Sequence, residues 1–432
     1  MSEKRLRAYL FTAVTLVAWF IYFRTTAPTV VFWDVGEFLA TSVILGVPHP
    51  PGTPLYVILG KFMTLLPLPL GFLYKLLTGR QAVESVLRLT LIAITSGALS
   101  AGFVYLLTVK TLSLWRSKVP PYFAHIAGVF GALIGAFAHT VWFNAIEAET
   151  YAPSTVVMFL VTWIMWLWWE KKDQPGSVKY LLFTIYVVVL SSGIHLLSLI
   201  ILPALFLFVL FIKPEQSWIF ALSFIFPFTF FSGSIYLKLL IISPLFFAGL
   251  WMIKKSWIGD LEIVGASLAA LAIRLAVELS YTPSTFSWVL LFITFLGFML
   301  YLNAKGMLDF NSVWTLIMLL GGILIVVGNP KVGIFSSWNW AIFGSFIATL
   351  GLYMQANLYK DWRGLTVLLI LIALSVELYL ILRAQAAPRI NEADPSNWRA
   401  FMDVLMRKQY EPATLFPRRI PFINQLKVFW LY

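Results

Sequence analysis

Long apolar stretches alternate with short polar connections along almost the whole chain. The first apolar stretch, residues 8–23, follows a basic head that contains Lys4, Arg5 and Arg7. Crossing a membrane takes about 20 apolar residues. A cleaved signal would have a shorter core and a small-residue cleavage site, whereas Arg24 follows here. The pattern therefore predicts a retained spanning helix with its amino terminus in the cytoplasm, where basic flanks are favoured.

The second apolar stretch, residues 55–66, is too short to cross and is followed by Pro67. We interpret it as an interfacial helix, and a helix at 33–45 would be a second one in the first outward loop, residues 28–85. The stretch 86–109 then returns to the cytoplasm, so that basic side chains follow it on the inner side, as positive-inside orientation requires. These side chains are Lys110, Arg116 and Lys118.

The remaining apolar stretches continue the alternation. They are residues 123–141, 153–169, 180–193, 196–212, 218–231, 235–253, 261–279, 286–302, 313–328, 335–354 and 365–382. The predicted fold is an all-α polytopic membrane protein of about 13 spanning helices, built on the usual crossing length. Residues 1–383 form the membrane domain. Residues 384–432 are rich in charge, Pro and Asn, and we predict a small extracytoplasmic cap that leans on that domain.

Composition supports a membrane class: 60% of the residues are hydrophobic, 12% are charged, and the mean hydropathy is +0.87. The formal charge of +12 comes from Lys and Arg between apolar stretches, which indicates membrane orientation and contact with lipids before it indicates nucleic acid. Cysteine is absent, which excludes disulfides and thiolate chemistry. Nucleotide-binding loops, the serine-hydrolase elbow and the zinc-protease motif are also absent from the sequence.

Ionisable residues gather directly after the first predicted span, in the segment 32–59. Asp34 and Glu37 share one face if their segment is helical, and His49 stands in the rigid turn His-Pro-Pro-Gly. Charged side chains at a membrane border have an unfavourable desolvation free energy, so a cluster of them indicates a functional site. The alternatives are a solvated loop end for the two acids and a structural corner with an incidental histidine for His49.

A second acidic cluster lies on the same predicted side, in NAIEAETY. Glu147 and Glu149 are two residues apart, so only one of them is expected to face a site, with Tyr151 beside them; the other acid would favour the start of the next helix. His195, in the outer turn SSGIHLLSL, could reach the same cleft or be an ordinary hydrogen-bonded interfacial group. Arg274 and Glu278, four residues apart in an apolar stretch, indicate an internal ion pair.

Four motifs carry a family resemblance: WDVGEF, HPPGTPLY, NAIEAETYA and the late LRAQAAPRINEADP. Together they resemble a glycosyltransferase family of the GT-C superfamily, which has bacterial members and an animal member that is a protein O-mannosyltransferase of the endoplasmic reticulum. The resemblance departs at Glu392-Ala393, where the animal-type pattern has Trp-Gly and where the RA and N-x-x-DP stretch comes earlier in the chain.

The resemblance implies transfer of mannose or another hexose from a polyprenyl-phosphate donor to a hydroxyl of a protein, glycan or lipid at the extracytoplasmic face. Asp34 would be the general base, with Glu37 and His49 beside it. Glu147 and Glu149 match the second acidic segment, and Arg383 matches an arginine that could hold the donor phosphate. A divalent cation, Mg²⁺ or Mn²⁺, could bind Asp34 with Glu147 or Glu149, although metal-independent members of the superfamily exist.

Two other classes of function are compatible with the apolar pattern. A transporter or flippase of a lipid-linked substrate would be expected to carry charges near the membrane midplane and to show an inverted repeat, and the sequence shows no such repeat. A non-catalytic scaffold of a membrane complex is the third alternative. The predicted location is a bacterial inner membrane, with a cytoplasmic amino terminus and an extracytoplasmic carboxyl terminus.

Overall fold

The computed structural model describes residues 2–115, 118–217, 219–220, 362–405, 407–410 and 420–431, with scattered positions between 297 and 351. These residues form helices and no strand. The α-helices are α1 (Glu3–Thr25), α2 (Val35–Ile44), α3 (Pro54–Leu65), α4 (Leu70–Thr78), α5 (Glu84–Ser113), α6 (Pro121–Ala136), α7 (His139–Ala145), α8 (Tyr151–Lys171), α9 (Val178–Leu190), α10 (Leu202–Ile212), α17 (Trp362–Leu374), α18 (Leu378–Gln385), α19 (Trp398–Leu405) and α20 (Phe422–Leu431). The 3₁₀ turns are η1 (Ser191–Gly193), η2 (Leu196–Ile201), η3 (Pro214–Gln216) and η4 (Ser375–Glu377).

Four described helical segments are long and apolar enough to cross a membrane: α1, α5, α8 and Leu368–Gln385. Each overlaps a span predicted from the sequence. The predicted span 123–141 is divided, because α6 ends at Ala136 and α7 turns away from it by 69°. Helices α3 and α4 are likewise bent by 82°, so the described part holds up to six spans if each bent pair is counted as one.

Several predictions fall beyond the described residues. They are the spans at 235–253 and 261–279, nearly all of 218–231, all but scattered positions of 286–302, 313–328 and 335–354, and the pairing of Arg274 with Glu278. The total of about 13 spans and the interfacial position of α3 stay predictions.

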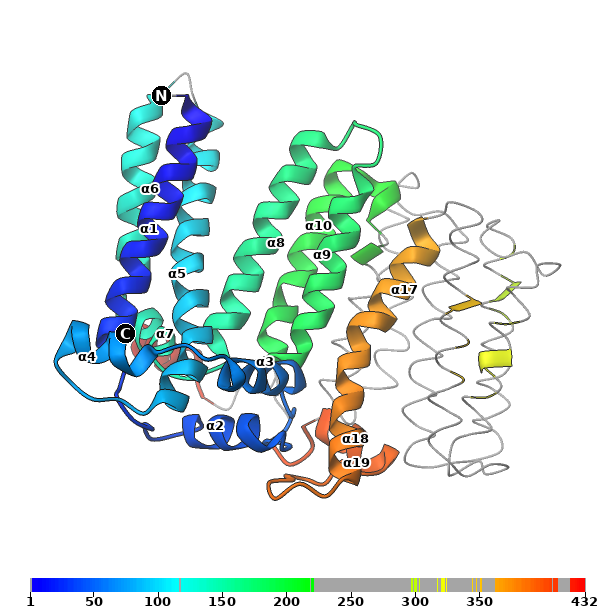
Figure 1. Cartoon of the computed structure of the whole chain (residues 1–432). Helices are drawn as coiled ribbons and strands as arrows, with labels where there is room; N and C mark the ends of the chain where they lie inside the picture. The colour runs from blue at the N-terminus through cyan, green and yellow to red at the C-terminus, as the bar shows by residue number, and fades with distance from the viewer. Residues whose placement is uncertain are drawn as a thin grey trace.

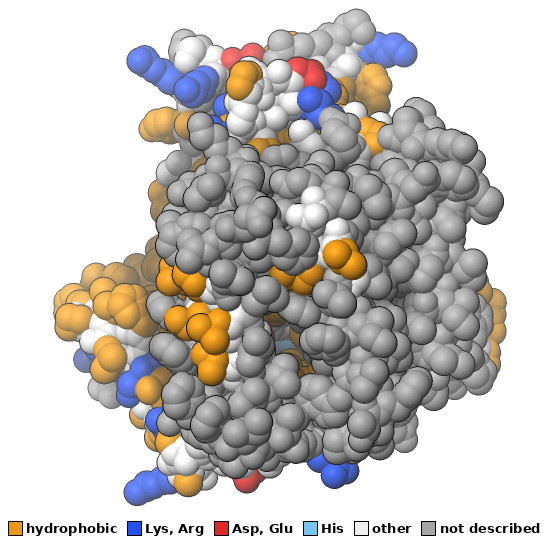
Figure 2. All heavy atoms as spheres, turned by 90° about the vertical axis from the view of Figure 1, so that its right-hand side faces the viewer, with side chains coloured by type: hydrophobic (Ala, Val, Ile, Leu, Met, Phe, Trp, Pro, Cys, Tyr) orange, Lys and Arg blue, Asp and Glu red, His pale blue; other side chains and the backbone are white. Residues whose placement is uncertain are grey.

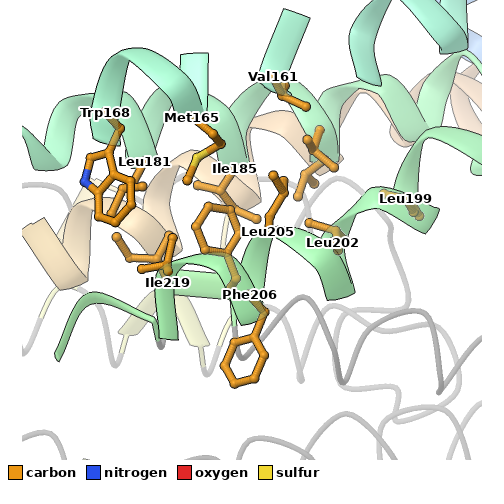
Figure 3. Packing of buried hydrophobic residues seen from close by; sticks show 14 of the residues in the cluster. Val161, Met165, Trp168, Leu181, Ile185, Leu199, Leu202, Leu205, Phe206 and Ile219 are labelled. Carbon is orange, nitrogen blue, oxygen red and sulfur yellow. The ribbon is translucent and has the colours of Figure 1, made fainter. Parts of the chain in front are cut away.

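Two hydrophobic clusters hold the described helices together. The first joins α1, α4, α5 and α6 around fully buried aromatic side chains, among them Tyr22, Tyr74 and Tyr105. The second joins α8, α9, α10 and α17 around Trp168 and Phe206, and Figure 3 shows its interdigitated side chains. Helices α5 and α8 pack against each other, so the two clusters are parts of one bundle.

The two ends of this bundle differ (Figure 1). The amino terminus of α1, the carboxyl ends of α5 and α8 and the start of α9 lie at one end, whereas α2, α3, α18 and α19 lie at the other. In Figure 2 the coloured Lys and Arg side chains are concentrated toward the upper and lower parts, with mostly hydrophobic coloured side chains between them. This distribution is typical of a protein with its apolar belt in a membrane.

Candidate active site

Helix α2 positions the first three candidate residues. Asp34 occupies the position just before its first residue, Glu37 lies in its first turn, and His49 is in the turn that leads to α3. Ligand atoms of these three side chains all lie within 4.8 Å of one another. The structure therefore brings together Asp34, Glu37 and His49, and the predicted shared face of the two acids is confirmed.

Glu37 holds His49 with both of its carboxylate oxygens. Oε1 accepts the backbone N–H of His49 at 2.6 Å, and Oε2 lies 2.8 Å from the ring Nδ1. Burial opposes ionisation of Glu37, but the two hydrogen bonds to His49 outweigh it, and the pKa of Glu37 lies below its ordinary value. The hydrogen bond to Glu37 raises the pKa of His49 despite partial burial, and the charges of Glu37, Asp34 and Glu392 raise it further.

A small hydrophobic cluster packs against this arrangement. It joins Val35 and Phe38 of α2 to Tyr56 of α3, and it continues to Ala148 and Ile194. The Phe38 ring contacts both His49 and Tyr56, with ring centroids 5.7 and 5.2 Å apart. Packing against these side chains restricts their rotamers, so α2 carries its two carboxylates on a fixed platform.

The second acidic segment reaches this platform through Glu149. Glu149 is 5% exposed, and burial is the main cause that raises its pKa to about 7, assisted by the negative charges of Asp34 and Glu147. Glu147 is less buried, and burial also raises its pKa. The charge of Asp34 acts on Glu149 and is not among the causes of the Glu147 shift, and that one acid of the pair faces a site stays a prediction. Glu149 also precedes the first residues of α8.

Tyr151 and His195 form a third side of the site. Their ring centroids are 5.3 Å apart, and Nδ1 of His195 accepts the backbone N–H of Leu197 at 3.0 Å. Burial, followed by the positive charges of Arg407 and His49, lowers the pKa of His195 to about 4. His195 is therefore neutral at pH 7, and with Nδ1 accepting, the ring proton is on Nε2. The hydrogen bond from Leu197 agrees with the interpretation of His195 as a hydrogen-bonded group, and its role in the site stays a prediction.

Arg383 lies at the other end of α2. Its Nε donates to the Leu45 carbonyl at 2.7 Å and its Nη2 to the Ile44 carbonyl at 3.4 Å, so the guanidinium binds the carboxyl end of α2. Cations are favoured there by the helix dipole. A contact between Arg383 and a donor phosphate stays a prediction. The contacts of Arg383 that the structure shows are the two hydrogen bonds to the carboxyl end of α2.

The segment after α18 runs beside the His49 turn and adds residues that the sequence analysis did not assign to the site. Val47 donates to Ile390 at 2.9 Å, and Glu392 donates to Val47 at 3.0 Å, which makes an isolated parallel bridge. The charge of Glu392 acts on Glu37, His49 and Asp34, and burial is the main cause that raises its own pKa. The sequence signal available for Glu392 was its position in the family motif, where the animal-type pattern has Trp-Gly and this chain has Glu392-Ala393.

Arg407 is the second residue that the sequence analysis did not assign to the site. It follows α19, and it is close enough to Tyr151 and His195 for its charge to act on both. Nothing in its sequence context, VLMRKQY, distinguishes it from a surface arginine. Only the docking of α19 brings it to a site built from residues more than 200 positions earlier.

A divalent cation fits one set of described residues. Asp34, Glu37 and His49 offer two carboxylates and one imidazole, a mixed oxygen and nitrogen set that suits Mn²⁺ better than Mg²⁺. A cation there would replace the hydrogen bond between Glu37 and His49. Neither Glu147 nor Glu149 belongs to this group, so the predicted pairing of Asp34 with one of them as metal ligands stays a prediction.

Comparisons with known proteins point to one family over the part of the chain that carries the site. The family model described as the N-terminal domain of protein O-mannosyl-transferase TMEM260 matches residues 34–219, from Asp34 to a point beyond His195. A curated relative, protein O-mannosyl-transferase tmem260 of Dictyostelium discoideum, is 26% identical over 208 residues. That alignment covers 46% of this chain and 23% of the relative. No solved structure matches the chain significantly.

These matches support a membrane protein that resembles an O-mannosyltransferase. The chain aligns with only about a quarter of its curated relative's length, so the activity of the whole relative is not transferred by similarity. Arg383, Glu392 and Arg407 lie outside the matched residues.

Proposed function

We propose that this protein is a membrane glycosyltransferase of GT-C type that transfers mannose or another hexose from a polyprenyl-phosphate donor to an acceptor hydroxyl. The observation that carries the proposal is the convergence of Asp34, Glu37, His49 and Glu149 at one end of an apolar helix bundle, within the region that matches the O-mannosyltransferase model. The acceptor is a hydroxyl of a protein, a glycan or a lipid.

Asp34 is the general base in this proposal. Inverting transfer needs a carboxylate that removes the proton of the acceptor hydroxyl as the sugar carbon is attacked. Both oxygens of Glu37 are bound to His49, whereas the Asp34 carboxylate has no hydrogen bond or ion pair among the described residues. Asp34 is therefore the acid of this pair that is available to accept a hydroxyl proton.

The other groups serve orientation and charge. Glu37 orients His49, whose raised pKa favours the cationic form beside the acids. Neutral His195 can donate a hydrogen bond from Nε2 to a sugar hydroxyl. A divalent cation bound by Asp34, Glu37 and His49 would add Lewis-acid stabilisation of the departing phosphate. The apolar belt accommodates the polyprenyl chain.

The location follows from the same proposal. The end of the bundle that holds the amino terminus of α1 faces the cytoplasm and the end that holds α2 faces outward, in a bacterial inner membrane with about 13 spans. Residues 384–432 then form the extracytoplasmic cap, and α3 lies in the interface. In the cysteine-free chain, single cysteines at Phe32, an exposed position on the same side of α3 as Thr53, and at the exposed Arg80 should both react with an impermeant reagent added outside intact cells. Protection of the Arg80 probe would contradict this topology.

The activity is tested with purified protein, labelled polyprenyl-phosphate hexoses and a membrane extract as the source of acceptors. We expect label to move from the lipid to an acceptor fraction. Uptake of the labelled lipid across a proteoliposome membrane without transfer would instead support a flippase. Neither result, with every hexose donor tested, would support a scaffold. A reaction in which chelator and subsequent Mn²⁺ addition have no effect would remove the cation from the site.

A further inference from the structure

We propose that Arg407, from the segment that follows the last described spanning helix, completes the site as the residue that binds the phosphate group of the donor. The inference deepens the proposed function and rests on it for the identity of the ligand. It concerns a residue outside the region that matches the family model, which ends at residue 219.

The segment that carries Arg407 is firmly attached to the His49 turn. Besides the Val47 bridge, Tyr379 donates to the Gly46 carbonyl at 2.9 Å. Helix α19 adds Phe401, Met402 and Val404, all 5% exposed or less, to a cluster with Val47 and with Leu380 of α18. A Cβ atom added at Gly46 would lie 2.9 Å from the carbonyl oxygen of Ile390, so the backbone segments around these two residues are in close contact. Arg407, three residues after Val404, has its position set by this docking.

The backbone at Arg407 has an unusual conformation at the end of α19. Its N–H donates to the Val404 carbonyl at 3.0 Å, and its backbone has φ 52°, in the left-handed region that non-glycine residues rarely adopt. The guanidinium carbon lies 4.6 Å from the centre of the Tyr410 ring. On the side of the site, the guanidinium charge acts on Tyr151 and His195. The backbone conformation is an outlier of the kind that is retained where a side chain must be aimed.

The guanidinium of Arg407 also has unused hydrogen-bonding capacity. Its Nε is buried without a hydrogen-bond partner, and no ion pair of Arg407 occurs in the part of the chain that the structure describes. A buried donor without a partner is costly, and an arginine fork matches the oxygens of a phosphate. Arg383 differs, because Nε and Nη2 of that residue are bound to carbonyls of α2. Arg383 thus uses two of its five N–H donors on α2, whereas no hydrogen bond of the Arg407 guanidinium occurs in the described part of the chain.

A phosphate bound by Arg407 agrees with the distribution of charge around the site. The acids of the platform repel an anion, so the donor needs a cation on one side while its sugar faces Asp34. Arg407 is close enough to Tyr151 and His195 for its charge to act on both, and it would stabilise the phosphate as the sugar leaves it. The bond between the sugar carbon and the phosphate oxygen breaks, the acceptor oxygen takes its place, and the acceptor proton passes to Asp34.

The test measures binding of lipid phosphate separately from sugar transfer. Full-length protein in nanodiscs is titrated with radiolabelled polyprenyl monophosphate, with the unphosphorylated polyprenol and with inorganic phosphate as competitors. We expect polyprenyl phosphate to bind, polyprenol to bind at least tenfold more weakly, and Arg407→Ala to raise the dissociation constant about tenfold or more, with partial recovery in Arg407→Lys. Arg399→Ala, on the exposed side of the same α19, is the matched control and should bind as the parent does.

The outcomes separate the two proposals. Parent-like binding by Arg407→Ala overturns the inference, and so does a parent protein that binds polyprenol as tightly as polyprenyl phosphate. Competition by millimolar inorganic phosphate that depends on Arg407 supports a site for the phosphate group itself. Binding that depends on Arg407, in a parent that transfers no sugar from any donor, keeps the inference and refutes the transferase. Unfolding of Arg407→Ala is checked by its thermal transition, and Arg407→Gln replaces it if needed.

Discussion

Two corners of the segment between α1 and α5 use the same kinds of side chain in different ways. At the corner between α3 and α4, Glu84 accepts the backbone N–H groups of Leu70 and Gly71 at 2.9 and 2.7 Å, and Arg88 pairs with it at 3.3 Å. At the corner between α2 and α3, Glu37 also accepts two donors, but both come from His49. Each carboxylate fixes a corner by two hydrogen bonds.

The charge around the two carboxylates is what differs. Glu84 is neutralised by Arg88, which also donates to Thr64 and Leu68 carbonyls at the end of α3. Near Glu37 lie two further acids, Asp34 and Glu392. Arg383 does not neutralise them in the way that Arg88 neutralises Glu84, because it donates to the carboxyl end of α2. Hydrogen-bond geometry alone therefore does not distinguish a structural carboxylate from a functional one. The uncompensated negative charge does, because keeping it costs stability that a purely structural corner would not require.

The largest expected effect tests that excess charge directly. Asp34→Asn preserves the shape of the side chain but removes its basicity, so kcat should fall by about 10² or more. Binding of polyprenyl phosphate should survive. Transfer at close to the parent rate by Asp34→Asn, together with loss of transfer in Glu147→Gln or Glu149→Gln, would move the base to the second acidic cluster.

The sequence predicted much of the corner between α2 and α3, but it could not predict the residues from the end of the chain that dock near it. The apolar pattern placed α1, α5 and α8, and the short spacing in WDVGEF placed Asp34 and Glu37 on one face, because both features depend on neighbours along the chain. The break after Ala136 was not predicted, since 123–141 is apolar on both sides of it. Glu392 and Arg407 reach the site only through long-range docking, which leaves no periodic signal in a single sequence.

The second expected effect concerns the pH dependence of stability through Glu149. Its pKa rises from 4.5 to about 7 on folding, so the folded state binds more protons than the unfolded state between these values. Stability should be greatest below pH 4.5 as far as this group is concerned, and should fall as the pH rises through 7. The difference corresponds to about 3 kcal/mol for a shift of this size.

Glu149→Gln removes this titration. Thermal unfolding in detergent should therefore show the variant gaining stability relative to the parent at pH 8 but not at pH 4. Glu170→Gln, at the opposite end of the bundle where Lys110 pairs with the acid, is the control in which charge removal should not stabilise the protein at pH 8. An equal response of Glu149→Gln at both pH values would show that the excess charge is not located at Glu149.

The third effect compares the two corners. Glu37→Gln weakens the hydrogen bond and removes the charge that together raise the pKa of His49, so we expect kcat to fall about tenfold. Glu84→Gln weakens the charge-assisted contacts to α4 and Arg88, so we expect a loss of about 1 to 2 kcal/mol in stability with a smaller change in kcat. Measurement of kcat and of the thermal transition for both variants decides the comparison. It fails if Glu37→Gln loses stability without losing activity.

The smallest expected effect distinguishes the two arginines that bind helix ends. Arg88→Ala and Arg383→Ala each leave the carbonyls at the end of one helix without their cation, which should cost about 1 kcal/mol. Because α2 carries Asp34 and Glu37, Arg383→Ala should also lower kcat a few-fold, whereas Arg88→Ala should change kcat less. Donor binding should stay within about threefold in both variants if the phosphate is held by Arg407, since loss of a charge-assisted contact would cost more. A donor dissociation constant that rises tenfold in Arg383→Ala, and much less in Arg383→Lys, would instead place Arg383 at the phosphate.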